Sequence, residues 1–577
     1  RLLLDFKEDL LVPLSKIDIM DSPYYKKVEE EITNLNYEPK EKINYKPIEP
    51  KEPKVKPFLN IFYDVETHTV ETITVENGKH IPYLCCYRIK GICHTQYGTD
   101  CGLEMLWHLS NTFKKSISTI RLIAHNGGKY DNQFMIKYFI TGLTGIKKGS
   151  KYMKLNGKFN GVNFELRDSL LIIPMPIKSF NKTFELGDTI KEVISYNMYN
   201  KTDCIKRKLI PINEGIYWVR KDGLDEQQFL NNIKKWNLQQ GENYDCVEYS
   251  RFYCEIDCEI LEKGYTIFKK WMQELVKMNI DDCLTLASLA HNFFINEECY
   301  EGVNELSGTP QQFIQKCVVG GRVMCCDNKK TIENQGKKIM DFDAVSLYPS
   351  AMARMDGYLK GLPKPLLEKV GQKELNKYDG YFLQIIIKSV GINRKFPTMS
   401  FVNDEGIRVF TNEMIGKTMF IDKIALEDAI KYHNIDFEVI RGYYFDEGFN
   451  TKINETIHHI FNERKKLKAQ KNPAETVYKL IMNSAYGKTI LKEIETEIRF
   501  FNDEDDMNVF ISRNYNWVQA YEQIDDSKMW VLDKINPIND HFNIPHIGVS
   551  ILSMSKRIMN EVMGLAEDNN LEMFYQD

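Results

Sequence analysis

Short apolar runs alternate with amphipathic stretches between residues 58 and 275. The run "FLNIFYDVETHTV" predicts a buried strand that ends in acidic residues, and "IRLIAHNGGKYDNQFMIKYF" predicts a second strand, a Gly-Gly loop and a helix. Helical periodicity follows in "EYSRFYCEIDCEILEKGYTIFKKWMQELV", at the end of this region. Strands and helices that alternate in this way over roughly 200 residues are typical of an α/β domain.

The second half of the chain has a different pattern. After a helical stretch and the hinge "VVGGRV", the segment "DFDAVSLYPS" predicts a strand with two carboxylates at its tip. Residues 357–450 predict mixed strands and loops, and residues 496–540 predict a polar, acidic surface insertion. Two helices are predicted on either side of Asn472-Pro473, and a long helix is predicted before the final strand "LEMFYQD".

Length and composition predict several domains. A chain of 577 residues is too long for one hydrophobic core, and with 43% hydrophobic and 12% aromatic residues it can bury several. Residues 38–57 hold five prolines among alternating charges, which predicts an extended linker rather than a helix or an inner strand. We therefore expect residues 1–57 to be an N-terminal segment and linker.

Charge and cysteine usage restrict the function less strongly. The net charge of −5 is not that of a small DNA-binding domain, but a large enzyme can confine positive charge to one groove. The 13 cysteines include the adjacent pairs Cys85-Cys86 and Cys325-Cys326 without paired CxxC spacing, so they predict neither a zinc site nor a disulfide framework. No apolar run reaches about 18 residues. We expect a reducing, intracellular compartment and no membrane partner.

Three acidic segments would form one metal site if the fold brought them together. Asp64 and Glu66 are two residues apart on a predicted strand, so their carboxylates face one side. Asp131 follows a strand and a glycine loop, and Tyr253 and Asp257 lie four residues apart on one helix face. An isolated acidic pair at a strand end is more often a solvated surface feature. Together, these carboxylates suit two divalent cations, with a tyrosine to orient an attacking water.

The order DxE, NxxxYD and YxxxD resembles the DEDD-type 3′–5′ proofreading exonuclease of family B DNA polymerases. The resemblance implies that Asn126 and Tyr130, in the second motif, contact DNA. The segment "RDSLLIIPMPIKSF" is similar to the primer-terminus-binding segment of the same domain, with Ser169 and Leu170 at the matching positions. It therefore implies an exonuclease that binds a DNA 3′ end.

The segment "DFDAVSLYPS" resembles the DxxSLYP motif of the polymerase palm in the same family. The resemblance implies a metal-binding aspartate at Asp343, a sugar-discriminating tyrosine at Tyr348 and a DNA contact at Ser346. A carboxylate at a strand tip can bind Mg²⁺ while substrate phosphates complete the octahedron. Asp341, on the same face of the predicted strand, is the alternative ligand.

The segment "YKLIMNSAYGKT" is similar to the KxxxNSxYG motif of this family. Lys and Asn do not belong on the apolar stripe of a core helix, so the residues themselves favour a functional role. The resemblance implies that the ammonium neutralises triphosphate charge and that the Tyr-Gly pair packs on the nascent base pair. The residues implied to contact nucleotide or DNA are Lys479, Asn483, Ser484, Tyr486 and Gly487.

Upstream of that motif, Arg464 and Lys468 are candidates for further nucleotide phosphate contacts. A basic run of this kind is otherwise a solvated helix face. At the end of the chain, "FYQD" resembles the start of the YxDTD motif, whose two aspartates complete the palm metal site. Asp577 matches the first aspartate, and the second would fall two residues beyond the end. Since the chain also begins without methionine, we expect a fragment that is truncated at its C-terminus and lacks the thumb.

The protein-primed branch of family B resembles this chain most, over residues 58–577. In that branch a YxGG-type motif joins exonuclease to palm. Here Val318-Val319 precede Gly320 and Gly321, so the tyrosine is replaced, while the glycines still allow close backbone approach to the template. The resemblance implies a primer–template DNA, dNTPs and a terminal protein that supplies the priming hydroxyl as partners. Residues 357–450 and 488–540 lie where this branch carries insertions that contact the terminal protein.

Together these patterns predict an α/β multidomain fold, with a ribonuclease-H-like exonuclease domain followed by a right-hand polymerase that has palm and fingers. The expected parts are 58–275 for the exonuclease, 276–356 for a connecting region and the first palm segment, 357–450 for an insertion, 451–495 for the fingers, 496–540 for a second insertion and 541–577 for the second palm segment. The expected activity is DNA-directed DNA polymerisation with proofreading, with two Mg²⁺ or Mn²⁺ ions per active site.

Two alternatives remain. One is an exonuclease whose polymerase half has become inert. The other is a non-catalytic scaffold that binds DNA or the terminal protein. The intact carboxylates and the Lys/Asn stripe argue against the scaffold, because these polar residues would be lost before the apolar pattern.

Overall fold

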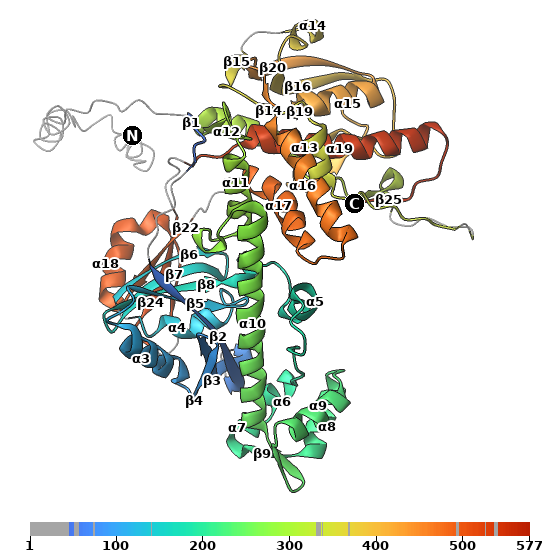
Figure 1. Ribbon diagram of the computed structural model, residues 1–577. Coiled ribbons are helices and arrows are strands. Elements are labelled where there is room, and N and C mark those ends of the chain that lie inside the picture. The colour runs from blue at the N-terminus through green and yellow to red at the C-terminus, as the bar shows by residue number, and fades with distance from the viewer. Residues whose placement is uncertain are drawn as a thin grey trace, which may run out of the picture. The chain divides into compact units, whose positions relative to one another are not determined.

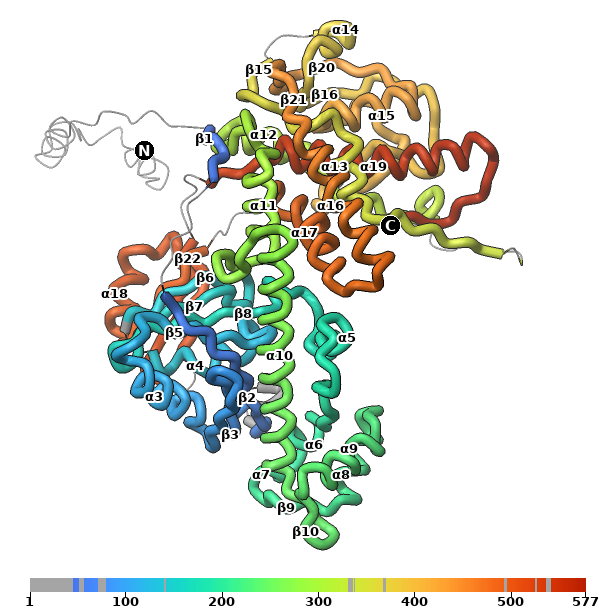
Figure 2. Tube along the Cα trace, viewed as in Figure 1, coloured from blue at the N-terminus to red at the C-terminus, as the bar shows by residue number. Residues whose placement is uncertain are grey.

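The computed structural model describes residues 45–50, 57–72, 75–139, 141–329, 336, 338–366, 370–491, 496–524, 527–535 and 541–577 (Figures 1 and 2). Residues 45–577 form one unit. Most of the predicted N-terminal segment and linker therefore lies outside the described residues. Within the linker, strand β1 (Tyr45–Pro47) pairs antiparallel with β12 (Asn304–Leu306) in a two-stranded sheet, so these three exposed residues are extended and form neither a helix nor an inner strand.

A seven-stranded mixed sheet with the order β4-β3-β2-β5-β8-β7-β6 organises the first half of the chain. The central strands β2, β5 and β8 are parallel, and the flanking pairs are antiparallel. Apolar residues fill the centre because parallel strands are covered on both faces. The strands are β2 (Phe58–Thr72), β3 (Val75–Ile89), β4 (Ile92–Tyr97), β5 (Thr119–Ala124), β6 (Thr141–Lys148), β7 (Lys151–Phe159) and β8 (Val162–Asp168).

The long helix α10 (Cys246–Val276) packs against β2 and β3 (Figure 1). The Asp245 carboxylate begins the helix by accepting hydrogen bonds from two backbone N–H groups of its first turn, at 3.1 and 3.0 Å. The helix ends at Lys277, which adopts a left-handed conformation with φ 57°. Because its apolar residues enter two separate cores, α10 joins the sheet to the elements on its other side.

Smaller elements surround this sheet. The helices are α3 (Cys101–Phe113), α4 (Asp131–Ile136), α5 (Phe180–Phe184), α6 (Tyr196–Lys201), α7 (Cys204–Arg207), α8 (Ile212–Lys221) and α9 (Glu226–Lys235). A small sheet has the order β10-β11-β9, with β9 (Leu209–Pro211), β10 (Gln239–Gln240) and β11 (Asn243–Asp245). The predicted alternation of strands and helices is present.

The predicted strand at "DFDAVSLYPS" is wrong. Residues 338–344 have no regular structure, and helix α13 (Leu347–Arg354) follows them. The apolar side chains Ile339, Met340 and Phe342 are 59%, 65% and 81% exposed. Without a partner strand among the described residues, this run buries nothing, and an isolated strand is not stable.

Residues 357–450 build a module of their own. Its four-stranded sheet has the order β15-β20-β16-β19, and α15 (Lys423–His433) packs on that sheet through a separate apolar core. The strands are β14 (Tyr358–Leu359), β15 (Lys364–Leu366), β16 (Gly380–Val390), β17 (Ser400–Val402), β18 (Arg408–Phe410), β19 (Thr418–Asp422), β20 (Ile435–Phe445) and β21 (Phe449–Asn450), with the short helix α14 (Gln372–Leu375). This segment is more regular than the mixed pattern suggested.

The two predicted helices around Asn472-Pro473 are present as α16 (Lys452–Ala469) and α17 (Glu475–Thr489). The long helix α19 (Pro545–Asp568) is also present, followed by the short strand β25 (Tyr575–Gln576). Two further helices, α11 (Leu286–Asn296) and α12 (Gly308–Gln315), and the strand β13 (Met324–Cys325) connect the two halves. None of the described helices combines the length and the apolarity that a membrane span requires.

The polar segment after α17 is not a simple surface insertion. It forms a sheet with the order β22-β24-β23, and Ile498 and Val531 enter the core of the seven-stranded sheet. Lys147 on β6 pairs with Asp533 at 3.1 Å. The elements are β22 (Thr496–Phe501), α18 (Glu504–Asn514), β23 (Val518–Gln523) and β24 (Trp530–Ile535). Although this segment is rich in acidic residues, it also has a small apolar face, which packs against the first half of the chain.

One apolar cluster contains residues of both halves of the chain. Phe62 and Ile123 of the seven-stranded sheet belong to the same cluster as Phe268 of α10, Met482 of α17 and Ile547 of α19. Burial of apolar area in a shared core favours joint stability of the two halves.

We predict that Phe268→Ala destabilises the whole unit. The Phe268 side chain is fully buried and packs edge-on against Phe184, with ring centroids 6.1 Å apart. Its loss should lower the free energy of unfolding by about 3–5 kcal/mol, measured by urea titration. Tyr515→Ala is the control, because Tyr515 is 78% exposed, and it should change stability by no more than about 0.5 kcal/mol. Equal unfolding midpoints for the two variants would contradict the shared core.

Candidate functional site

A cleft of about 370 Å³ opens beside the middle of β2, next to α4 and α10. Its lining includes the four carboxylates that the sequence predicted to share a site, which are Asp64, Glu66, Asp131 and Asp257. Glu66, Asp131 and Asp257 are buried, and Asp64 is half-buried. The fold thus brings together three segments that are far apart in the sequence.

Local backbone structure positions these carboxylates. Asp64 and Glu66 lie on β2, where a register shift follows Glu66. Asp131 is the first residue of α4, and its Oδ1 accepts a hydrogen bond of 3.1 Å from the Val65 N–H between the two β2 acids. Asp257 reaches the cleft from α10. This hydrogen bond from the β2 backbone to the Asp131 side chain keeps the carboxylates of β2 and α4 close together.

The environment of the cleft opposes ionisation of its four carboxyl groups and raises their pKa values. Burial and the neighbouring Asp257 raise the pKa of Asp64 from 3.8 to about 6. Burial, and then the Asp64 charge, raise the pKa of Glu66 and of Asp131. Burial also raises the pKa of Asp257, whose Oδ1 is buried without a hydrogen-bond partner among the described residues. A group of buried oxygens with raised pKa values and an unpartnered atom fits divalent cations.

Lys191 is a cleft residue that the sequence motifs did not identify. Its ammonium forms an ion pair with Asp257 and lies 4.7 Å from the centroid of the Tyr253 ring. Tyr253 itself is buried, and its hydroxyl is 2.8 Å from that of Tyr196, which lines the cleft. Tyr196 therefore stands between Tyr253 and the open space. Both missed residues lie in "IKEVISYN", where no strand or helix signal drew attention to them.

The glycine loop before α4 is held by one buried carboxylate. Asp168 accepts hydrogen bonds from the N–H groups of Asn126 at 2.9 Å, Gly128 at 3.3 Å and Leu170 at 2.9 Å. A Cβ on Gly128 would lie 2.3 Å from the Tyr152 carbonyl oxygen, so glycine is required there. Asp168 thereby joins the loop to the segment predicted to bind the primer terminus.

The residues of this half that were predicted to contact DNA differ in whether their side chains reach the open space of the cleft. Asn126 lines the cleft in a left-handed conformation with φ 64°, and Tyr130 lines it with its hydroxyl bonded to Thr67 and to His80. The Ser169 hydroxyl is buried and donates to the Ala124 carbonyl at 3.1 Å. Ser169 therefore supports the loop in this structure, while Asn126 and Tyr130 face the open space.

The polymerase motifs form a second, more exposed surface. The Tyr348 ring stacks on that of Tyr486, with centroids 4.4 Å apart and planes 8° apart. Lys479, Asn483 and Gly487 are exposed on the same helix as Tyr486, with Ser484 half-buried beside them. Thus the predicted stripe of α17 faces away from the core. Ser346 begins α13 in a left-handed conformation with φ 52°.

The two basic candidates upstream of this motif differ. Arg464 forms an ion pair with Glu475 at 2.6 Å between Nε and Oε2, so its charge is already partnered within the helix pair. Lys468 is exposed. Of the two, Lys468 is the side chain that is open to a solvent-borne phosphate.

The structure does not place the two predicted palm carboxylates on a common sheet. Asp343 and the alternative Asp341 are exposed in the irregular segment 338–344, and Asp577 is exposed after β25. Strand β25 pairs with β13 instead. Among the described residues, neither Asp343 nor Asp577 belongs to a cluster of three potential ligand atoms.

Arg322, which was not among the predicted site residues, anchors β25. Its buried guanidinium donates to Gln576 Oε1 at 2.6 Å and to the carbonyl oxygens of Phe396 and Pro397 at 3.1 and 2.9 Å. It directly follows Gly320 and Gly321, which are exposed and have open space where a Cβ would be. The glycine hinge is therefore linked to the residue that precedes Asp577.

Comparisons of sequence identify relatives over most of the chain. A family model described as "DNA polymerase type B, organellar and viral" matches residues 112–564. A DNA polymerase of Kluyveromyces lactis is 22% identical over 560 residues, covering 90% of this chain and 52% of the relative. A probable DNA polymerase of Ascobolus immersus is 23% identical over 525 residues, covering 88% and 41%. The chain spans about half, or less, of the length of these relatives.

Solved structures show the same fold. A crystal structure of Phi29 DNA polymerase matches with a TM-score of 0.58 and 16% identity, covering 90% of this chain and 79% of that chain. Phi29 DNA polymerase complexed with primer-template DNA and incoming nucleotide substrates matches with a TM-score of 0.57, 16% identity and coverage of 91% and 79%. The predicted α/β multidomain fold is confirmed at this level.

We predict an unusual pH dependence for the metal-free protein. Because the folded state raises the pKa of Asp64 to about 6, it holds this proton more tightly than the unfolded chain does. Relative to Asp64→Asn, the free energy of unfolding of the wild type should fall as the pH rises from about 4 to about 6. Urea titrations in EDTA across this range measure the difference.

Asp404→Asn is the matched control for this experiment, because Asp404 is exposed and remote from the cleft. It should follow the wild type at every pH. Mn²⁺ should stabilise the wild type above this range and have a smaller effect on Asp64→Asn. If wild type and Asp64→Asn lose stability in parallel, the cleft carboxylates do not repel one another as described.

Proposed function

Because the chain belongs to the organellar and viral DNA polymerases of type B, we propose that its protein is a DNA-directed DNA polymerase with a 3′–5′ proofreading exonuclease. The observation that carries the nuclease part is the cleft in which Asp64, Glu66, Asp131 and Asp257 meet. We assign residues 58–275 to the exonuclease domain, ribonuclease-H-like in the order of its central strands.

In the exonuclease cleft, these four carboxylates would hold two divalent cations. Bound Mg²⁺ or Mn²⁺ supplies charge neutralisation at the scissile phosphate and lowers the pKa of a nucleophilic water. The hydroxyl pair of Tyr196 and Tyr253 orients that water, and Lys191 offsets negative charge next to Asp257. Asn126 and Tyr130, which line the cleft, contact the 3′ end of the DNA, and Leu170 lies in the segment that Asp168 ties to the same loop.

In the polymerase half, we assign 276–356 and 541–577 to the palm and its connection, and 451–495 to the fingers. Tyr348 forms the floor under the sugar of the incoming nucleotide, and Tyr486 packs on the nascent base pair. Exposed Lys479, Asn483 and Lys468 receive the triphosphate. Asp343 and Asp577 are the proposed cation ligands, and they require segment 338–344 to move beside β25.

We also propose that the two modules at 357–450 and 496–540 contact a terminal protein that supplies the priming hydroxyl. The first has a sheet and a core of its own, which suits a docking module on a polymerase. The second buries Ile498 against the exonuclease sheet. Its remaining exposed surface is the part that would contact a terminal protein.

One observation favours a second candidate function, an exonuclease whose polymerase half is inert. The nuclease carboxylates meet in one cleft, whereas Asp343 and Asp577 are exposed on separate segments. Separation-of-function variants distinguish the two candidates.

We predict that Asp64→Ala/Glu66→Ala and Asp343→Ala separate the two activities of the full-length protein. The first should lower shortening of a 5′-labelled primer by at least about 100-fold, since even an outer-shell partner of a metal costs roughly 10–100-fold. The second should abolish primer extension with dNTPs and leave shortening intact. Extension that survives Asp343→Ala refutes the palm assignment. Shortening without extension in every form of the protein supports the nuclease alternative.

We predict that Tyr348→Val admits ribonucleotides. The ring of Tyr348 excludes a 2′-hydroxyl by its volume, so its loss should reduce discrimination against rNTPs by at least about tenfold, or about 1.4 kcal/mol in the barrier difference. Single-nucleotide incorporation with dNTP and rNTP measures the ratio. Tyr515→Val, at an exposed and remote tyrosine, is the control. An unchanged ratio in Tyr348→Val removes this residue from sugar selection.

A further inference from the structure

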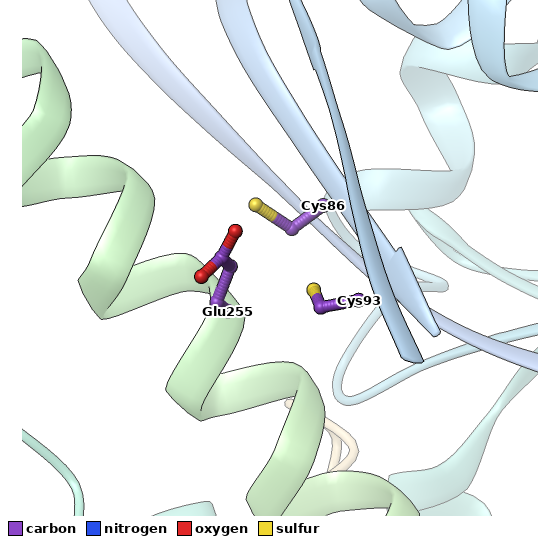
Figure 3. Close-up of side chains that lie close together, drawn as sticks. All are labelled: Cys86, Cys93 and Glu255. Atoms are coloured by element: carbon purple, nitrogen blue, oxygen red, sulfur yellow. The ribbon is translucent and has the colours of Figure 1, made fainter. Parts of the chain in front are cut away.

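Three potential metal ligands meet between the β3–β4 hairpin and α10. The Sγ atoms of Cys86 and Cys93 and a carboxylate oxygen of Glu255 lie within 4.8 Å of one another. Figure 3 shows the two thiols of the hairpin and the carboxylate of α10 directed toward a common point. The cysteines are separated by six residues, a spacing that gave no metal signal in the sequence.

The strand register explains why both thiols face α10. In the β3–β4 hairpin, Cys86 pairs with Thr95, and Arg88 pairs with Cys93. Because side chains alternate along a strand, all four lie on one face. Cys85 lies on the opposite face, where its thiol contacts Met105 Sδ at 3.7 Å within an apolar core. Cys86 and Cys93 also contact an apolar cluster, but unlike Cys85 they lie beside the polar atoms of Thr95 and Glu255.

The surroundings of these thiols suit a bound cation. Thr95 Oγ1 donates to Glu255 Oε1 at 3.0 Å, and Arg251 Nη1 donates to the same oxygen at 2.7 Å. Among the described residues, both of these hydrogen bonds end on Oε1, so Oε2 is the oxygen left to bind a cation. Two thiolates and one carboxylate with a divalent cation leave one excess negative charge, and the guanidinium of Arg251 lies beside the carboxylate to offset it.

We propose that Cys86, Cys93 and Glu255 bind one soft divalent cation of the Zn²⁺ class, separately from the carboxylate cleft. Thiolates select such cations over Mg²⁺. Zn²⁺ commonly takes four ligands, and the half-buried Cys93 leaves one side open to water. A thiol pair and a carboxylate from two elements match this preference.

The site joins the β3–β4 hairpin, which is next to β2, to α10, which carries Asp257. Cys86 is directly opposite Asp64 in the sheet and faces the same side, and Glu255 lies on α10 between Tyr253 and Asp257. A cation that binds the hairpin and α10 together would hold these two elements in place beside the cleft. The bound cation is therefore a structural clamp rather than a reactant.

A disulfide between the two cysteines fits the register less well. Cys86 and Cys93 are diagonal neighbours, since each is directly opposite another residue. Diagonal neighbours are about 7–8 Å apart, and a disulfide requires Cα atoms within about 7 Å. A cation can bridge sulfur atoms that are too far apart for a covalent bond.

Binding of Co²⁺ to the reduced full chain tests this site directly. The Asp64→Ala/Glu66→Ala variant serves as the background, because Asp64, Glu66 and Cys254 form another group of potential ligands. The background should bind one equivalent of Co²⁺ with a sulfur-to-cobalt charge-transfer band that Zn²⁺ abolishes. Adding Cys93→Ser should remove most of the band and weaken binding by at least about 100-fold, more than the loss of an outer-shell partner costs.

Two further variants make the result specific. Cys326→Ser is the matched control, because Cys326 is also half-buried and lies outside the cluster, and it should leave the band unchanged. Glu255→Gln should keep the band and weaken binding by at least about tenfold, even if Cys93→Ser folds poorly. The proposal is overturned if the background shows no band, if Glu255→Gln binds like the background, or if a well-folded Cys93→Ser does. A Cys86–Cys93 disulfide in unreduced protein, with no Co²⁺ binding after reduction, also overturns it.

Discussion

The burial of neighbouring carboxylates in one cleft is the constraint on which the first half of the molecule depends. Glu66, Asp131 and Asp257 are buried beside Asp64, and burial raises the pKa of each. Such a group is costly to ionise unless cations or fixed positive charge offset it. Among the described residues, the ammonium of Lys191 pairs with Asp257, and Asp257 Oδ1 has no hydrogen-bond partner. In the metal-free protein, the buried carboxylates therefore lower the folding stability, while they give the cleft the capacity to bind cations. Such a trade-off is common at functional sites.

Helix α10 transmits this constraint to the rest of the chain. It contributes Asp257 to the cleft, Glu255 to the thiol cluster and Phe268 to the core that contains residues of both halves. One side of α10 lies in a polar site and another side lies in a shared core. The helix therefore cannot rotate about its own axis, because a shift by one residue would move polar side chains into the core. This provides a physical link between the carboxylate cleft and the polymerase motifs that requires no direct contact between them.

The polymerase half is organised differently. Its motif residues are exposed or half-buried. Lys479 and Asn483 on α17 are open to solvent, and the half-buried rings of Tyr348 and Tyr486 stack on each other. Arg322 fixes β25 through Gln576, whereas Asp343 lies on an irregular segment. In the proposed palm site, one ligand would follow a firmly held strand and the other would lie on an irregular segment, so that assembly of the site would require movement. The carboxylates of the cleft, by contrast, are brought together by packing.

The sequence by itself determined the local elements and the family. Strong periodicity predicted α10, α16, α17 and α19, and spaced motifs identified the four cleft carboxylates, because both signals depend on residues close in sequence. Only the tertiary structure decided the rest. It paired β25 with β13, left 338–344 unpaired, placed Ile498 in a distant core, and brought Lys191 and the Cys86, Cys93 and Glu255 cluster into position. Those outcomes depend on strand register and on packing between remote segments, and no local pattern of residues encodes either.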